Sequence, residues 1–120
     1  MDKLEVKRQN SLQAVTELIV LLERCKEFNW ASKFYPVKDA LSDYDLDKAI
    51  TSYRHIPMPN MGGFLDLILC KENGHTVRNE EIDNKLLISI GGALSQTISN
   101  LEVYITKKTD KEEVIIPNGS

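Results

Sequence analysis

The first 28 residues place apolar side chains along one helix face, and this pattern constrains the fold more than any other. Its members lie three or four residues apart: Val15, Leu18, Ile19, Leu22 and Cys25. Charged side chains fall mainly on the other side of the same helical wheel. This period is that of an amphipathic α-helix. We predict a helix from about Leu4 to Phe28.

Two shorter helices are predicted next. Asn29 reads as a break or cap, after which apolar residues repeat at intervals of four, three and four: Trp30, Phe34, Val37 and Leu41. Pro36 must then lie in the first turns of this helix or kink it. Ser42 or Asp43 can cap a third helix, because a short polar side chain accepts from the first free N–H groups. Its apolar face would carry Leu46, Ala49, Ile50 and Tyr53.

The middle of the chain is harder to assign. The segment 57–63 is rich in proline and glycine and should end the third helix. Phe64 to Cys70 is a short apolar run that fits a buried strand or a helix. Its helical neighbours favour a helix, which Gly74 would terminate.

A long helix is predicted to close the chain, with Asn79 as its N-cap. Its expected core stripe holds Ile82, Leu86, Ile90, Ala93, Thr97, Leu101 and Tyr104. Glycine in a helix interior costs about 1 kcal/mol against alanine. We therefore interpret Gly91-Gly92 as a close approach between helices or a kink. Residues 107–120 are expected to form a tail or a packed strap.

Together these elements predict an all-α fold, a compact bundle of four or five helices in a single domain over residues 1–120. A chain of 120 residues can build one core without disulfides or metal. Cys25 and Cys70 lie in apolar runs, so both are expected to be buried, reduced thiols.

Several classes of function are disfavoured. The charged N-terminus lacks a signal-peptide pattern, and Val15 to Leu22 is too short to span a bilayer. We therefore expect a cytoplasmic protein without membrane association. A net charge of −3 argues against nucleic acid as the main ligand.

No catalytic, metal or cofactor motif stands out. His55, His75 and the two cysteines lack the spacing of metal sites, and Gly62-Gly63 lacks the residues of a nucleotide loop. We predict no catalytic residues, no metal, no cofactor and no small-molecule substrate. A small hydrolase or transferase that uses Asp66 and His75 remains an alternative.

Acidic residues are concentrated in the middle of the chain. From Asp39 to Asp83 there are nine acidic and four basic residues, a net charge of −5. Such a surface can steer a basic partner, although a solvated surface explains it equally well. Tyrosine among acids is typical of an interface rim. The candidate partner-binding residues are Asp39, Asp43, Tyr44, Asp45 and Asp47, with Glu72, Glu80 and Glu81. Asp66 is assigned a structural hydrogen bond or an ion pair with an arginine such as Arg54 or Arg78.

A family resemblance rests on the segment after the third helix. This segment reads Met61-Gly62-Gly63-Phe64-Leu65-Asp66-Leu67-Ile68-Leu69. With a tryptophan early in the second helix and a long closing helix, it resembles small bacterial α-helical immunity proteins of polymorphic or contact-dependent inhibition toxin systems. The resemblance implies a protein that binds and neutralises a cognate toxin, commonly a nuclease, in the producer's cytosol. A helical adaptor with another partner is the alternative.

Overall fold

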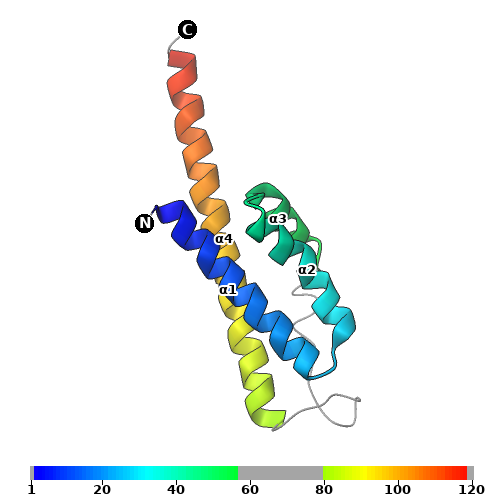
Figure 1. The fold of residues 1–120 in the computed structure, drawn as a ribbon. Helices are drawn as coiled ribbons and strands as arrows, with labels where there is room; N and C mark the ends of the chain where they lie inside the picture. Colours follow the sequence, from blue (N-terminus) through cyan, green and yellow to red (C-terminus); the bar gives the residue numbers. More distant parts are fainter. Residues whose placement is uncertain (1, 57–79, 119–120) are drawn as a thin grey trace.

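The computed structural model describes residues 2–56 and 80–118, with the backbone alone for Glu80 and residues 108–118. Four helices make up this part of the chain: α1 (Lys3–Arg24), α2 (Phe28–Ser42), α3 (Leu46–Arg54) and α4 (Glu80–Asn118) (Figure 1). The predicted all-α bundle is confirmed. The predictions for Phe64 to Cys70, Gly74 and the Asn79 cap lie outside the described residues.

Helix α1 is the centre of the bundle. It packs against α4 on one side and α2 on the other, and α3 packs against α2 (Figure 1). An ion pair joins Arg24 at the end of α1 to Asp83 at the start of α4. At the other end, the Lys7 ammonium lies 5.8 Å from the centre of the Tyr104 ring. Helices α1 and α4 therefore run antiparallel.

The predicted stripe of α1 forms the middle of the core. Val15, Leu18, Leu22 and Cys25 are completely buried. Cys25 is a free thiol, and burial is the main cause that raises its pKa. Since the thiolate is the reactive form, this cysteine is expected to be inert. No helix in residues 2–56 and 80–118 is long and apolar enough to cross a membrane.

Both short connections in the first half are helix-stop motifs without glycine. After α1, Lys26 has a φ of 63°, and the Glu27 N–H donates to the Leu22 carbonyl at 2.7 Å. This bond and the one from the Lys26 N–H to the Glu23 carbonyl (3.0 Å) define a Schellman motif. The predicted end of α1 at Phe28 was wrong, because a lysine in the left-handed region gives no sequence signal of a stop.

Helix α2 also differs from its prediction. It begins at Phe28, so Asn29 lies inside the helix and does not break it. Pro36 lies in the middle of α2 rather than in its first turns, on an exposed position. The N-cap of α3 is Asp45, whose side chain accepts from the Lys48 N–H at 3.2 Å, and neither Ser42 nor Asp43 has this role.

The core stripe of α4 is shifted by one residue from the predicted one over most of its length, although Leu101 is buried and Ile90 packs against the core as predicted. The buried positions are Asp83, Leu87, Gly91, Leu94, Ile98 and Leu101, whereas Ile82 and Leu86 are 57% and 40% exposed. One residue is a rotation of about 100° around the helix axis. Some apolar side chains of α4 therefore lie outside the core and are exposed to solvent.

Residues 107–118 continue α4 as helix, and the expectation of a tail or a packed strap over residues 107–120 stays a prediction. Because Lys7 lies beside Tyr104, the partner helix α1 ends near residue 108 of α4. The remaining turns project beyond the bundle (Figure 1). Gly91 is buried on the core side, as a close helix approach requires, whereas a Cβ added at Gly92 meets nothing within 4 Å.

Replacing Lys26 with glycine should stabilise the protein by about 1 kcal/mol, because the left-handed conformation costs a side-chain-bearing residue about 1–2 kcal/mol. Urea unfolding followed by circular dichroism measures this gain. The matched control is Lys38→Gly inside α2, which should cost about 1 kcal/mol. A loss of stability in Lys26→Gly would contradict the strain at this turn.

Candidate functional site

Five of the predicted partner-binding residues lie together where α2 meets α3. We call Asp39, Asp43, Tyr44, Asp45 and Asp47 the acidic turn. Asp39 is in the last turns of α2, Asp43 is its C-cap, Asp45 is the N-cap of α3 and Asp47 follows in the first turn of α3. All five side chains are exposed, and Tyr44 is 64% exposed. The structure therefore brings these residues to one surface.

The backbone of the acidic turn is fixed by two caps that share a residue. Tyr44 has a φ of 61°, the Asp45 N–H donates to the Ala40 carbonyl at 2.9 Å, and the Tyr44 N–H donates to the Leu41 carbonyl at 3.3 Å. This is a second Schellman motif, and it ends α2. Since Asp45 also caps α3, no flexible linker separates the two helices.

Arg8 of α1 forms hydrogen bonds that fix the acidic turn against α1. Its Nη1 donates to the Leu41 carbonyl at 3.0 Å, and its Nη2 donates to the Tyr44 hydroxyl at 3.1 Å. The guanidinium carbon lies 4.0 Å from the centre of the Tyr44 ring, a cation–π distance. Arg8 is only 7% exposed. The tyrosine is thus fixed by its ring, its hydroxyl and its backbone while one face stays open to solvent.

The charge of Arg8 is balanced within α1. Its Nε donates to Glu5 at 3.0 Å, and this contact lowers the pKa of the Glu5 carboxyl and raises the pKa of Arg8. Because Glu5 already neutralises Arg8, the buried cation does not cancel the negative charge of the turn.

The carboxylates of the acidic turn are open to a partner. Within the described part of the chain, none of Asp39, Asp43, Asp45 and Asp47 takes part in an ion pair. One oxygen of Asp45 is used in the α3 cap. The other carboxylates are exposed to solvent and can pair with cationic groups of a docked protein.

Two of the remaining predicted partner residues, Glu80 and Glu81, are not part of this surface. Arg8 contacts the acidic turn and Arg24 contacts the start of α4, so about 16 residues of α1, or about 24 Å, separate the two places. Glu80 and Glu81 begin α4 at the far end, and Glu81 pairs with Lys85 at 3.0 Å. Glu72 lies outside the described residues.

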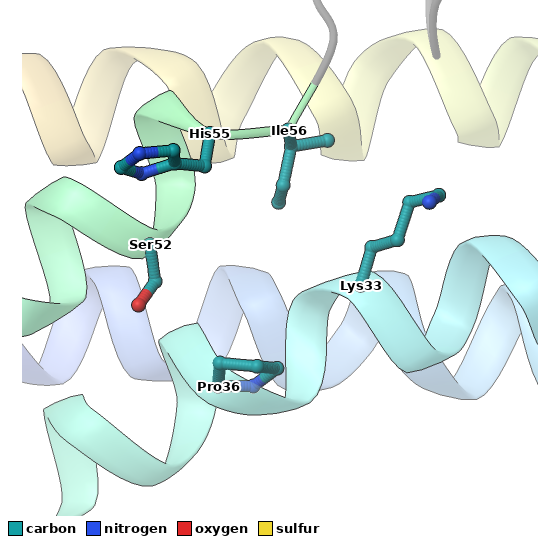
Figure 2. Close-up of a pocket in the computed structure, with 5 residues that line it drawn as sticks. All are labelled: Lys33, Pro36, Ser52, His55 and Ile56. Carbon is teal, nitrogen blue, oxygen red and sulfur yellow. The ribbon is translucent and has the colours of Figure 1, made fainter.

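A hollow of about 300 Å³ between α2 and α3 is a second candidate. Figure 2 shows Lys33 and Pro36 of α2 facing Ser52, His55 and Ile56 in and just after α3. The His55 Nδ1 lies 2.7 Å from the Thr51 carbonyl and donates to it, which leaves Nε2 for other contacts. Across the residues that the structure places, no hydrogen bond joins two of the five lining side chains, so the hollow has no assembled catalytic pair.

The described residues bear on only part of the other sequence hypotheses about chemistry. In residues 2–56 and 80–107 no group of three or more histidine, cysteine or acidic residues is placed to hold a metal. Asp66, Arg78 and His75 lie outside the described residues. Arg54, one of the two arginines considered for Asp66, forms its ion pair with Glu102.

Sequence reasoning missed Arg8 and the hollow. Arg8 is 36 residues from Tyr44, and nothing in its local sequence distinguishes it from the other charged residues of α1. Only the position of Arg8 could have indicated its role, because Arg8 falls on the buried stripe that continues back from Val15 and Ser11. A charged residue at a core position needs a partner.

Comparison of the chain with known protein families, with curated proteins and with solved structures finds no match.

Proposed function

We propose that this chain is an immunity protein, which binds a cognate bacterial toxin domain one to one and neutralises it in the cytoplasm. The toxin domain would be basic, most simply a nuclease whose cleft binds RNA phosphates. In this role the protein performs no reaction and needs no cofactor. Its working part would be the acidic turn.

The observation that carries this proposal is a set of four exposed carboxylates on a rigid turn. A partner with a cationic cleft is attracted to such a surface at long range, which raises the association rate. Two helix caps and Arg8 hold the turn in one conformation, so binding orders little additional chain.

Tyr44 would supply the anchor of the interface. Tyrosine is enriched among the residues that dominate binding energy, because it buries a large ring and keeps a polar end. Arg8 already restrains the ring, so its rotamer entropy is largely lost before binding. The surrounding carboxylates would then form the rim.

The test is isothermal titration calorimetry with the toxin domain encoded immediately upstream. Changing Asp43, Asp45 and Asp47 together to asparagine should weaken binding about 100-fold at low salt, and less at high salt where charges are screened. Asparagine caps a helix as well as aspartate does, so the α3 cap survives at Asp45. Unchanged affinity at low salt would exclude the acidic turn as the interface.

The matched control removes three other carboxylates: Glu17→Gln, Glu23→Gln and Glu81→Gln. These residues lie on α1 and at the start of α4, away from the acidic turn. Net charge changes equally in both triple variants, so an equal loss of affinity would mean that overall charge, and not the acidic turn, drives binding. Absence of binding to the upstream toxin would refute the immunity function.

A helical adaptor is the second candidate, and the exposed apolar residues of α4 favour it. Ile82, Leu86, Ile88 and Val103 are all at least 40% exposed on this one helix. An adaptor that docks through α4 would bind its partner with little dependence on salt, and the triple asparagine variant would bind normally.

A further inference from the structure

The hollow between α2 and α3 combines apolar and polar side chains around one space (Figure 2). Ile56 is only 6% exposed and is the most buried part of the lining, and Pro36 adds a second apolar side chain. The polar groups are the Lys33 ammonium, the Ser52 hydroxyl and the His55 ring. The volume of about 300 Å³ lies at the lower end of the range for small-molecule sites.

The described lining of the hollow offers positive charge and hydrogen-bond donors but no acidic group. None of its five residues is an aspartate or a glutamate, although the whole chain has 18 acidic residues and 15 lysines and arginines. An ammonium group donates only, and a hydroxyl group can donate. An anion is therefore the ligand whose charge the hollow complements.

The Lys33 ammonium and the Ser52 hydroxyl are not engaged elsewhere in residues 2–56 and 80–107. No ion pair of these residues includes Lys33. Its ammonium lies 5.8 Å from the centre of the Trp30 ring, a contact that does not neutralise the charge. The Ser52 side chain makes no hydrogen bond in the same residues. Both groups can therefore turn to a ligand without breaking an existing bond.

His55 can supply a third donor. Its Nδ1 donates to the Thr51 carbonyl at 2.7 Å, which fixes the ring and leaves Nε2 as the remaining nitrogen. A neighbouring anion favours the doubly protonated ring, in which Nε2 also donates.

The C-terminal end of α3 would ordinarily oppose an anion, because its free carbonyls carry partial negative charge. Two of these carbonyls already accept hydrogen bonds. The Thr51 carbonyl accepts from the His55 N–H at 3.2 Å as well as from the ring, and the Tyr53 carbonyl accepts from the Ile56 N–H at 3.1 Å. The residues that line the hollow thus weaken the negative end of the helix.

We propose that the hollow between α2 and α3 binds a small organic acid. The carboxylate of this ligand accepts hydrogen bonds from Lys33, Ser52 and His55. Its apolar body packs against Pro36 and Ile56. The acid is a ligand and not a substrate, because the hollow has no assembled catalytic pair.

This site is separate from the acidic turn. Lys33 precedes Asp43 by ten residues, which is about 15 Å along α2. The ligand site therefore does not depend on the proposed immunity function, and its test needs no toxin.

Titration of the full chain with sodium benzoate at constant ionic strength, followed by ¹H–¹⁵N NMR, tests the proposal. Benzoate joins a carboxylate to one small ring, and a ligand of this size should bind with a Kd of about 1–10 mM. The amide signals of Lys33, Ser52, His55 and Ile56 should shift and reach saturation. Benzamide lacks the charge and acetate lacks the apolar body, so each should bind at least about tenfold more weakly. Absence of a saturable shift at these amides, or equal binding of either control ligand, overturns the proposal.

A pair of lysine variants tests the place of binding. Lys33→Gln removes the ammonium and should weaken benzoate binding at least about fivefold. The matched control is Lys38→Gln on the same helix. Lys38 also lies over an aromatic ring, 5.9 Å from the centre of Tyr35, but it is not among the residues that line the hollow. This control should bind benzoate as the parent protein does. Equal losses in the two variants would mean that overall charge attracts the anion, and would overturn the proposal.

Discussion

Replacing Phe34 with alanine should lower the free energy of unfolding by about 3–5 kcal/mol. Phe34 is among the largest side chains of the core and has no exposed surface. Removing the ring loses its transfer free energy and leaves a cavity that the surrounding helices fill only in part. Since small domains are stable by about 5–15 kcal/mol, the variant would retain little stability.

The matched control for this change lies six residues earlier in the same helix. Phe28 is 58% exposed, so Phe28→Ala should change stability by no more than about 0.5 kcal/mol. Urea unfolding of both variants, followed by circular dichroism at 222 nm, measures the difference. Equal effects of the two substitutions would contradict the packing of α2 against α1.

The helices in the first half of the fold could be predicted from the sequence, because their core residues follow one helical period. The stripe from Val15 to Cys25 is apolar on one side only, so a single rotation of α1 buries it. Trp30 and Phe34 were assigned to the core for the same reason, and both pack there. The ends of α1 and α2 could not be predicted, because Lys26 and Tyr44 occupy left-handed positions that usually carry glycine.

The rotation of α4 could not be derived from hydrophobicity. Apolar residues occupy neighbouring positions along it, as in Leu86-Leu87 and Ala93-Leu94, so two stripes one residue apart fit the pattern. What distinguishes them is Asp83, a charged residue that the sequence places outside any core but that the structure buries. Asp83 is buried because it pairs with Arg24, which lies 59 residues earlier in the chain. The sequence around either residue does not indicate a pair between such distant positions.

The acidic turn was predictable in composition but not in shape. Four aspartates within nine residues indicated an exposed surface, and the structure confirms their exposure. The separation of Glu80 and Glu81 from them depends on the antiparallel path of α1 and α4. The net charge counted along the sequence therefore combined the acidic turn with the start of α4, which lie at opposite ends of α1.

Replacing Arg24 with methionine should lower the free energy of unfolding by about 3 kcal/mol at pH 7. Arg24 donates to both oxygens of Asp83, at 2.7 Å and 3.4 Å, and this contact is the main cause that raises the pKa of the guanidinium. The side chain of Asp83 is only 4% exposed, against 29% for Arg24. The variant would therefore leave a carboxylate in the core without its guanidinium. Methionine keeps much of the apolar stem, so the loss reports mainly on charge.

The effect of Arg24→Met should depend on pH. Loss of the guanidinium raises the pKa of the Asp83 carboxyl in the folded variant relative to the parent protein, because a neighbouring cation favours the charged form of a carboxyl. A group with a raised folded pKa favours the folded state at low pH and loses that contribution as pH rises through the folded pKa. The stability difference from the parent protein should therefore shrink as pH falls from 7 towards 4.

Two further variants separate charge from packing at Arg24. Arg54→Met removes an exposed arginine whose partner Glu102 is 36% exposed, and it should cost less than about 1 kcal/mol at either pH. The double variant Arg24→Met with Asp83→Leu should recover most of the loss, because an apolar pair replaces a buried ion pair at little cost. A loss in Arg24→Met that is the same at pH 7 and pH 4.5 would mean that Arg24 acts through its stem. In that case, the burial of Asp83 would follow from the packing of α4 against α1, and the ion pair would not select the rotation of the helix.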